Sequence, residues 1–195
     1  MSTSGSPSSS TTDRLLAAIA EALGRARIPY MVIGGQAVLV HGLTRLTQDI
    51  DVTLGVSIDE LNRVRRVLGE IGLEPLVDPE TFARETFVIP CQHAASALRV
   101  DMILSNSPYE REAIARAQPT RFAGVDVRVA SAEDLVIHKL IAGRPRDLED
   151  ARGVLLKNPS LDRSLVRRWL AEWAAVIEQP LLERFDGVER DARGR

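Results

Sequence analysis

The sequence is poor in several residue types, and each shortage narrows the range of functions. Only one of its 195 residues is a cysteine, Cys91, so no internal disulfide can form, which predicts a reducing cytoplasm. Aromatic residues make up 4% of the chain, too few to predict stacking platforms for single-stranded nucleic acid. The formal net charge of −2 argues against a surface coated in basic residues. No stretch approaches the ~20 apolar residues that a membrane span requires, and no signal-peptide pattern is visible.

What remains is the composition of an ordinary globular protein, 45% hydrophobic and 27% charged. We expect a disordered low-complexity tail over residues 1–11, a core over 12–130, a helical region packed on it over 131–185, and a flexible tail over 186–195. Residues 73–77 and 86–89 are predicted to be short strands, with residues 90–93 in a loop. The predicted fold class is α/β, with a small mixed β-sheet flanked by helices and a C-terminal helical region.

Two carboxylates share one face of a predicted strand. In the segment Asp49-Ile50-Asp51-Val52, side chains alternate with a period of two, so both aspartates point one way while Ile50 and Val52 enter the core. Two carboxylates side by side repel each other, which favours a cation held between them. Taken alone, the segment is also compatible with the polar edge of an ordinary strand.

A glycine pair precedes these carboxylates. Gly34 and Gly35 follow the apolar run of residues 30–33 and lead into a short predicted helix. A backbone without Cβ can approach a phosphate, with the helix N-terminus behind it, although a tight strand-to-helix turn is the simpler alternative. Gln36, the first side chain of the helix, is then placed to touch phosphate or metal-bound water. A phosphate cradle beside a carboxylate pair predicts metal-assisted phosphoryl chemistry.

This arrangement resembles the nucleotidyltransferase superfamily of the DNA polymerase β type. The family pattern is an apolar strand, Gly-Gly or Gly-Ser, a short helix, Asp-h-Asp-h (h, apolar) and a third aspartate on a later strand, which Asp101 offers here. The form Arg45-x-Thr47-x-Asp49-x-Asp51 looks closest to the minimal, AbiEii-like branch, which includes toxins of bacterial toxin–antitoxin systems. Residues 134–150 resemble the downstream block of the family, a helix bearing Lys-x-x-Ala followed by arginine and aspartate on the next helix.

The resemblance implies an enzyme of the EC 2.7.7 type, with a nucleotidyltransferase catalytic core over 12–130. Such an enzyme moves a nucleoside monophosphate from an NTP to an acceptor, with Mg²⁺, and releases pyrophosphate. The implied metal ligands, which are also catalytic, are Asp49, Asp51 and Asp101, the last completing the site that activates the acceptor hydroxyl. The implied nucleotide-binding positions are Gly34, Gly35, Gln36, Arg45, Thr47, Lys139 and Arg144.

The downstream block leaves alternatives open. Lys139 lies in an apolar predicted helix, where it is desolvated unless it finds an anion such as a nucleotide phosphate or extends to solvent. Its neighbour His138 is interpreted as a packed or surface histidine. By analogy Asp147 assists proton removal from the acceptor, slightly ahead of Asp150, for which an i,i+4 pair with Arg146 is an equally simple role. Lys139 and Asp147 complete the predicted catalytic set.

The AbiEii-like resemblance implies RNA, including tRNA, or a protein hydroxyl as acceptor, and a cognate antitoxin as a partner. A small hydroxylated molecule, as in the antibiotic-modifying members of the superfamily, is the alternative acceptor. A non-catalytic nucleotide-binding module that regulates a partner is a second class of hypothesis. All three carboxylates are present, which favours the enzyme.

Overall fold

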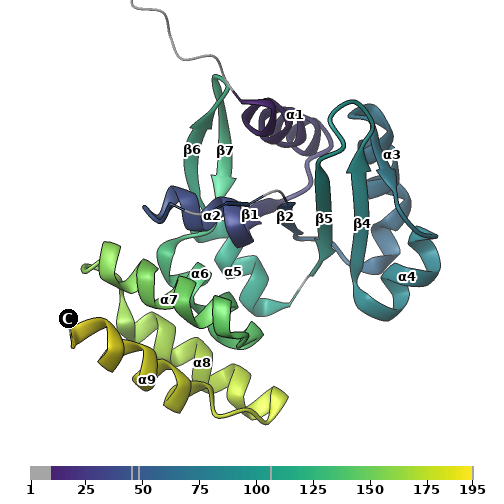
Figure 1. Ribbon diagram of the computed structural model, residues 1–195. Helices are drawn as coiled ribbons and strands as arrows, with labels where there is room; N and C mark the ends of the chain where they lie inside the picture. Colours follow the sequence, from purple (N-terminus) through teal and green to yellow (C-terminus); the bar gives the residue numbers. More distant parts are fainter. Residues whose placement is uncertain (1–9, 45, 48, 106, 195) are drawn as a thin grey trace, which may run out of the picture.

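A computed structural model describes residues 10–44, 46–47, 49–105 and 107–194, which build one mixed seven-stranded sheet flanked by helices (Figure 1). The strands are β1 (Tyr30–Ile33), β2 (Asp49–Leu54), β3 (Leu73–Pro75), β4 (Val88–His93), β5 (Arg99–Leu104), β6 (Gln118–Phe122) and β7 (Val125–Val129). Their order is β3-β4-β5-β2-β1-β7-β6; the pairs β2–β5 and β1–β7 are parallel and the other neighbours antiparallel. The predicted fold class is confirmed.

The helices are α1 (Thr11–Arg25), α2 (Gly34–Val40), α3 (Leu61–Glu70), α4 (Pro79–Thr86), α5 (Pro108–Arg116), α6 (Ala132–Ala142), α7 (Pro145–Lys157), α8 (Arg163–Ile177) and α9 (Leu181–Arg193), with a 3-10 turn at Ile58–Glu60. Helices α7, α8 and α9 gather at one end of the molecule, and α3 and α4 lie at the other (Figure 1). Among the described residues, no helix is both long and apolar enough to cross a bilayer. The domain boundary predicted near residue 130 falls between β7 and α6 and stays a prediction.

Successive side chains of β2 point to opposite faces of the sheet, one face toward the core and the other toward the candidate site. Ile50, Val52 and Leu54 are fully buried, as expected for one face of a strand packed on the core. Asp49 and Asp51 occupy the alternate positions on the opposite face. Strand β5 repeats the pattern in register, so that the polar faces of both strands form one surface.

The C-terminal end differs from the prediction. Residues 181–193 form α9, where a flexible tail was expected from residue 186. Leu181, Phe185 and Val188 follow helical spacing and are buried, and α9 contacts α7 and α8. A helix that packs against the protein on one side needs few apolar residues. The many charged residues between these three positions therefore made the segment look like a solvated tail.

The first helix begins earlier in the sequence than predicted. Ser10 caps α1 in a capping box with Asp13, so the helix starts at Thr11, inside the predicted 1–11 tail. Residues 1–9 of that tail lie outside the described residues.

Between residues 78 and 93 the structure has a helix for which no element was predicted, and a strand that starts at Val88 and continues through the predicted loop. Asp78 caps α4 by accepting a hydrogen bond from the Thr81 N–H, and Pro79 occupies the first turn, where its missing N–H costs nothing. Residues 90–93 belong to β4, not to a loop. Pro90 lies opposite Asp101 of β5, and its neighbours in the strand carry the pairing that proline cannot.

Candidate active site

The three predicted carboxylates lie on one surface. Asp51 of β2 and Asp101 of β5 are register partners on adjacent parallel strands, and Asp49 sits one pleat before Asp51 on the same face. All three line one cavity of about 510 Å³, which we call the carboxylate cavity. Arg99, the register partner of Asp49, donates a hydrogen bond from Nε to Asp101 Oδ1 at 3.2 Å. The structure therefore brings together residues that are about fifty positions apart in the sequence.

The carboxylates disfavour one another's charge. Burial raises the pKa of Asp51, and the neighbouring Asp101 and Asp49 raise it further. The Lys139 ammonium and the Gly35 backbone N–H, which donates a hydrogen bond to Asp51, partly offset this effect. A positive ion at this surface would relieve the repulsion.

Gly34 is a glycine for two reasons. Its φ of +61° lies in the left-handed region, where a Cβ is strained. A Cβ would also lie 1.9 Å from Asp51 Oδ2, far inside van der Waals contact. The space that glycine leaves at this turn is thus filled by the site's own carboxylate, before any substrate binds.

Gly35 makes room for Thr47 in the same way as Gly34 makes room for Asp51. A Cβ on Gly35 would lie 2.3 Å from Thr47 Oγ1, and the Thr47 hydroxyl donates to the Asp49 carbonyl oxygen at 3.3 Å. Both residues line the carboxylate cavity. Gln36 does not line it, and its side chain is buried. Arg45, the remaining predicted position of this motif, lies outside the described residues.

Lys139 is neither extended to solvent nor unpaired. It is 8% exposed, and its Nζ lies 2.8 Å from Asp147 Oδ1 and 2.9 Å from Asp150 Oδ2. Arg144 donates from Nε to the other Asp147 oxygen at 2.7 Å. The two acids that the sequence left as alternatives therefore both bind the same lysine, at the turn where α6 meets α7.

This network fixes the charge of Asp147. Burial opposes ionisation, but the hydrogen bonds from Lys139 and Arg144 outweigh it and lower the pKa of Asp147. A carboxylate with a lowered pKa is a weak base. The geometry therefore favours a positioning role for Asp147, which orients the two cations, over proton removal.

The rest of the carboxylate cavity comes from α6 and the following turn. Its lining is completed by Ile33, Ile103, Leu135, His138, Ala142 and Arg146, together with Lys139, Arg144 and Asp147. Arg146 was predicted only as a partner of Asp150; it donates a hydrogen bond to the Leu46 carbonyl oxygen at 3.3 Å and faces the cavity. His138 was interpreted as a packed or surface residue. No periodic signal distinguished it, because its place in the cavity depends on how α6 meets the sheet.

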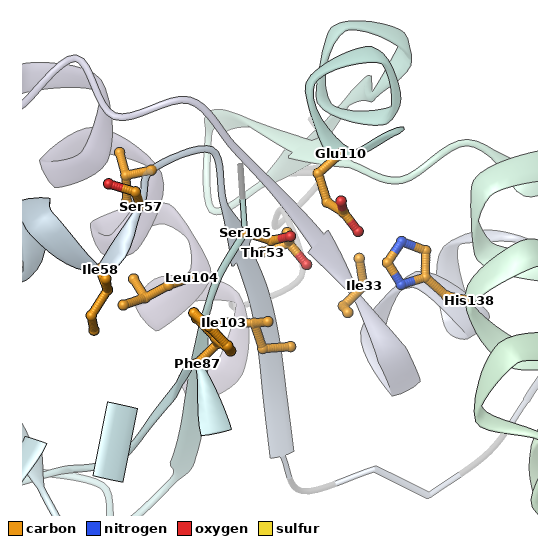
Figure 2. A pocket seen from close by; sticks show the side chains of 11 residues that line it. Ile33, Thr53, Ser57, Ile58, Phe87, Ile103, Leu104, Ser105, Glu110 and His138 are labelled. Carbon is orange, nitrogen blue, oxygen red and sulfur yellow. The ribbon is translucent and has the colours of Figure 1, made fainter. Parts of the chain in front are cut away.

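A second cavity of about 590 Å³ adjoins the first (Figure 2). We call it the apolar cavity, because six of its lining residues are Ile33, Val56, Ile58, Phe87, Ile103 and Leu104. Its polar lining residues are Thr53, Ser57, Ser105, Glu110 and His138. Ile33, Ile103 and His138 line both cavities, so the two spaces share a wall. No sequence motif indicates this cavity, because its walls come from six separate segments.

Among the described residues, no three Asp, Glu, His or Cys side chains form a ready-made metal cluster. Mg²⁺ is commonly held by only one or two carboxylates together with substrate phosphates and water. The donor set of the carboxylate cavity fits that kind of site, which a nucleotide would complete.

Comparison with solved structures places the fold among nucleotidyltransferases. The antibiotic-resistance factor ANT(2'')-Ia in solution is 18% identical over 85% of this chain and 95% of its own, with a TM-score of 0.56. An antigenic nucleotidyltransferase-like protein from Paracoccidioides brasiliensis is 16% identical over 89% and 92%, with a TM-score of 0.53. The lincosamide adenylyltransferase LnuA, bound to lincomycin, is 14% identical over 75% and 96%, with a TM-score of 0.51. These likenesses concern the fold.

No curated protein matches the sequence closely enough to serve as a relative. A family model described as "nucleotidyltransferase of unknown function (DUF6036)" matches residues 13–179. The superfamily inferred from the glycine and aspartate motifs is confirmed, and so is the enzyme class, whereas the AbiEii-like branch is not. The chain belongs to this DUF6036 family of nucleotidyltransferases.

Proposed function

We propose that the chain transfers a nucleoside monophosphate from an NTP to the hydroxyl of a small molecule, with Mg²⁺, in the carboxylate cavity. One observation carries the proposal. Asp49, Asp51 and Asp101 share one surface beside the Gly34-Gly35 turn, while the cations Lys139, Arg144 and Arg146 line the same cavity. Carboxylates on one side and phosphate-binding cations on the other suit a nucleotide triphosphate between them.

The carboxylates are the residues that would hold Mg²⁺. Asp49, Asp51 and Asp101 would be its ligands, together with the phosphates of the nucleotide. The raised pKa of Asp51, which follows from its burial and from its acidic neighbours, supports a cation here, because positive charge would remove the repulsion. Bound Mg²⁺ would neutralise phosphate charge and favour ionisation of the acceptor hydroxyl.

The chain's own groups bind and orient the nucleotide. Lys139, Arg144 and Arg146 attract the triphosphate. The turn at Gly34 and Gly35 makes room for side chains that face the same cavity. Asp147 and Asp150 hold Lys139 in place at the cavity wall. Because Asp147 stays ionised, it holds Lys139 in position when no nucleotide is bound.

The transfer step conserves atoms and charge. The acceptor oxygen attacks the α-phosphorus and forms a new P–O bond, while the bond from that phosphorus to the bridging oxygen breaks. Pyrophosphate leaves with the electron pair of the broken bond. The acceptor proton passes to the Asp101 carboxylate. Asp101 lies two residues before Ile103 on the same face of β5, and Ile103 lines both cavities.

The adjoining cavity favours a small acceptor. A space of about 590 Å³ has the size of a small-molecule site, and no lysine or arginine is among the described residues that line it. RNA would require cations along its path. The solved structures of ANT(2'')-Ia with adenylyl-2''-tobramycin and of LnuA with lincomycin support the proposal, since the fold accommodates small acceptors in those proteins. RNA and protein hydroxyls remain the second candidates, and no observation favours an antitoxin partner.

A label-transfer experiment tests this function. The protein is incubated with Mg²⁺ and each NTP, labelled either at the α- or at the γ-phosphate, and is offered total RNA, a small-molecule cell extract and itself as acceptors. We expect the α label on a small molecule and the γ label in pyrophosphate. Asp49→Asn should abolish both signals, and Asp59→Asn, an exposed aspartate outside the cavity, should preserve them. Label on RNA or on protein would show that the acceptor is a macromolecule and not a small molecule. No transfer from any NTP would contradict the proposed function.

A further inference from the structure

The apolar cavity holds polar groups that packing alone does not explain. Thr53 is 1% exposed, and its Oγ1 has no hydrogen-bond partner among the described residues. The Nε2 atom of His138 is likewise buried without a partner in that part of the chain. An unpaired buried polar atom costs about 1–3 kcal/mol, so two of them at one cavity point to a ligand that pairs with them.

Glu110 gives the cavity its charge. It is 7% exposed and is the sole acidic side chain among the described residues that line the space, which include no lysine or arginine. The Ser107 hydroxyl donates a hydrogen bond to Oε2, which links Glu110 to the cap of α5. Figure 2 shows the carboxylate directed into the cavity, toward the His138 ring. Burial lowers the pKa of His138, so its imidazole is neutral at pH 7 and does not balance this charge.

Phe87 supplies an exposed apolar surface at the same cavity. The residue is 52% exposed. Its φ of +59° is that of a helix C-cap: Phe87 ends α4 and donates its backbone N–H to the Ala83 carbonyl oxygen. Ile58 and Leu104 line the same space and offer further apolar contacts.

The position of the cavity suits the acceptor better than the nucleotide. Thr53 follows Asp51 by two residues on the same face of β2, and Ile103 follows Asp101 in the same way on β5, a step of ~7 Å. A molecule seated here therefore lies next to Asp51 and Asp101, one step further along the two strands. The cations that suit a triphosphate line only the other cavity, and the Glu110 carboxylate would repel phosphates.

We infer that the apolar cavity binds the acceptor of the transfer, a small molecule with an apolar ring skeleton, one hydroxyl directed at Asp101 and one protonated amine paired with Glu110. The role of acceptor rests on the proposed function. The amine site itself rests on the unpaired Thr53 and His138 atoms, on the buried carboxylate and on the exposed Phe87 ring. A carboxylate accepts hydrogen bonds but cannot donate them, so an ammonium is its natural partner.

Nuclear magnetic resonance tests the amine site directly. The probe is trans-4-aminocyclohexanol, and the matched compounds carry a carboxylate or a methyl group in place of the amine. We expect the amine to shift the ring signals of His138 and Phe87, and the carboxylate to bind at least about tenfold more weakly. Glu110→Gln retains the cap at α5, because the Ser107 hydroxyl accepts its hydrogen bond from the backbone N–H of residue 110. In this variant the amine should bind only as tightly as the methyl compound does.

Glu112→Gln is the matched control, since Glu112 lies on the same helix but does not line the cavity. This variant should keep the wild-type preference for the amine. Equal binding of amine and carboxylate, an unchanged preference in Glu110→Gln, or no shift at His138 and Phe87 would each overturn the inference.

A titration with MgATP separates this inference from the proposed function. We expect the nucleotide to shift the amide signals of Gly34 and Gly35 while the aminocyclohexanol stays bound at Phe87. Displacement of the amine by ATP would make the cavity a nucleoside site and overturn the acceptor assignment. If the Gly34 and Gly35 amides do not respond while amine binding still depends on Glu110, the proposed function fails and the acceptor assignment with it, whereas the amine site stands.

Discussion

Asp51 and Asp101 occupy the same register position on two adjacent parallel strands, with Asp49 one pleat away on the same face. This arrangement places like charges side by side at a partly buried surface, and their repulsion raises the pKa of Asp51 beyond what burial alone does. The fold therefore carries an electrostatic cost when no cation is present. That cost can be measured without knowing the substrate.

Asp51→Asn should stabilise the metal-free protein at neutral pH. A carboxyl group with a raised pKa in the folded state weakens the fold as pH rises through that pKa, whereas asparagine does not ionise. Thermal melts in EDTA should show a rise in Tm of a few degrees, since about 1 kcal/mol shifts the Tm of a chain this size by about 2–4 °C.

The gain in stability of Asp51→Asn over wild type should depend on pH. Below the ordinary aspartate pKa both states of the wild type are protonated, so the advantage of Asp51→Asn should disappear there. It should grow as pH rises and reach its full value above the raised pKa. A variant that melts below wild type at neutral pH would show that Asp51 is structural.

Gly34→Ala should cost both stability and nucleotide binding, because its Cβ would collide with the Asp51 carboxylate. Gly124→Ala is the matched control: Gly124 has a φ of +88°, but nothing lies within 4 Å of the position that an alanine Cβ would take. Each variant should lose about 1–2 kcal/mol through backbone strain. Denaturant unfolding should show a larger loss for Gly34→Ala, and calorimetry should show lost MgATP binding in that variant alone. Equal losses in the two variants would contradict the contact.

Lys139→Met should destabilise the protein by about 3–5 kcal/mol, since it leaves two buried carboxylates without their shared partner. The sequence has one other lysine, Lys157, which is exposed at the end of α7, so Lys157→Met is the matched control and should change little. Adding Asp150→Asn to Lys139→Met should restore part of the loss. Additive effects in this double-mutant cycle would argue against the ion pair.

Cys91 should resist alkylation in the folded protein. It is fully buried in β4, and burial raises the pKa of its thiol to about 12, so almost no thiolate is present at pH 8. Its reaction with iodoacetamide should follow the fraction of unfolded chain as denaturant is added. Rapid labelling of the native protein would mean that β4 opens locally.

The sequence was sufficient for the parts of the site that local periodicity determines. Asp49 and Asp51 were predicted to share a face because a strand alternates, and Asp101 was found by the same pattern. Lys139 with Asp147 and Asp150 was only partly predictable, since the turn between α6 and α7 determines which acids reach the lysine. The apolar cavity was not predictable, because Glu110 and Phe87 come to line one space only when distant segments pack together.

The turnover of Asp51→Asn, measured as Mg²⁺-dependent pyrophosphate release from NTP in the presence of the acceptor extract, decides whether these carboxylates perform the transfer. Its Tm is measured alongside. We expect a protein that melts higher than wild type without metal yet turns over at least about 100-fold more slowly, since a carboxylate that supports the charge of the transition state is gone. A folded Asp51→Asn protein that keeps wild-type turnover would contradict the assignment of these carboxylates to the reaction.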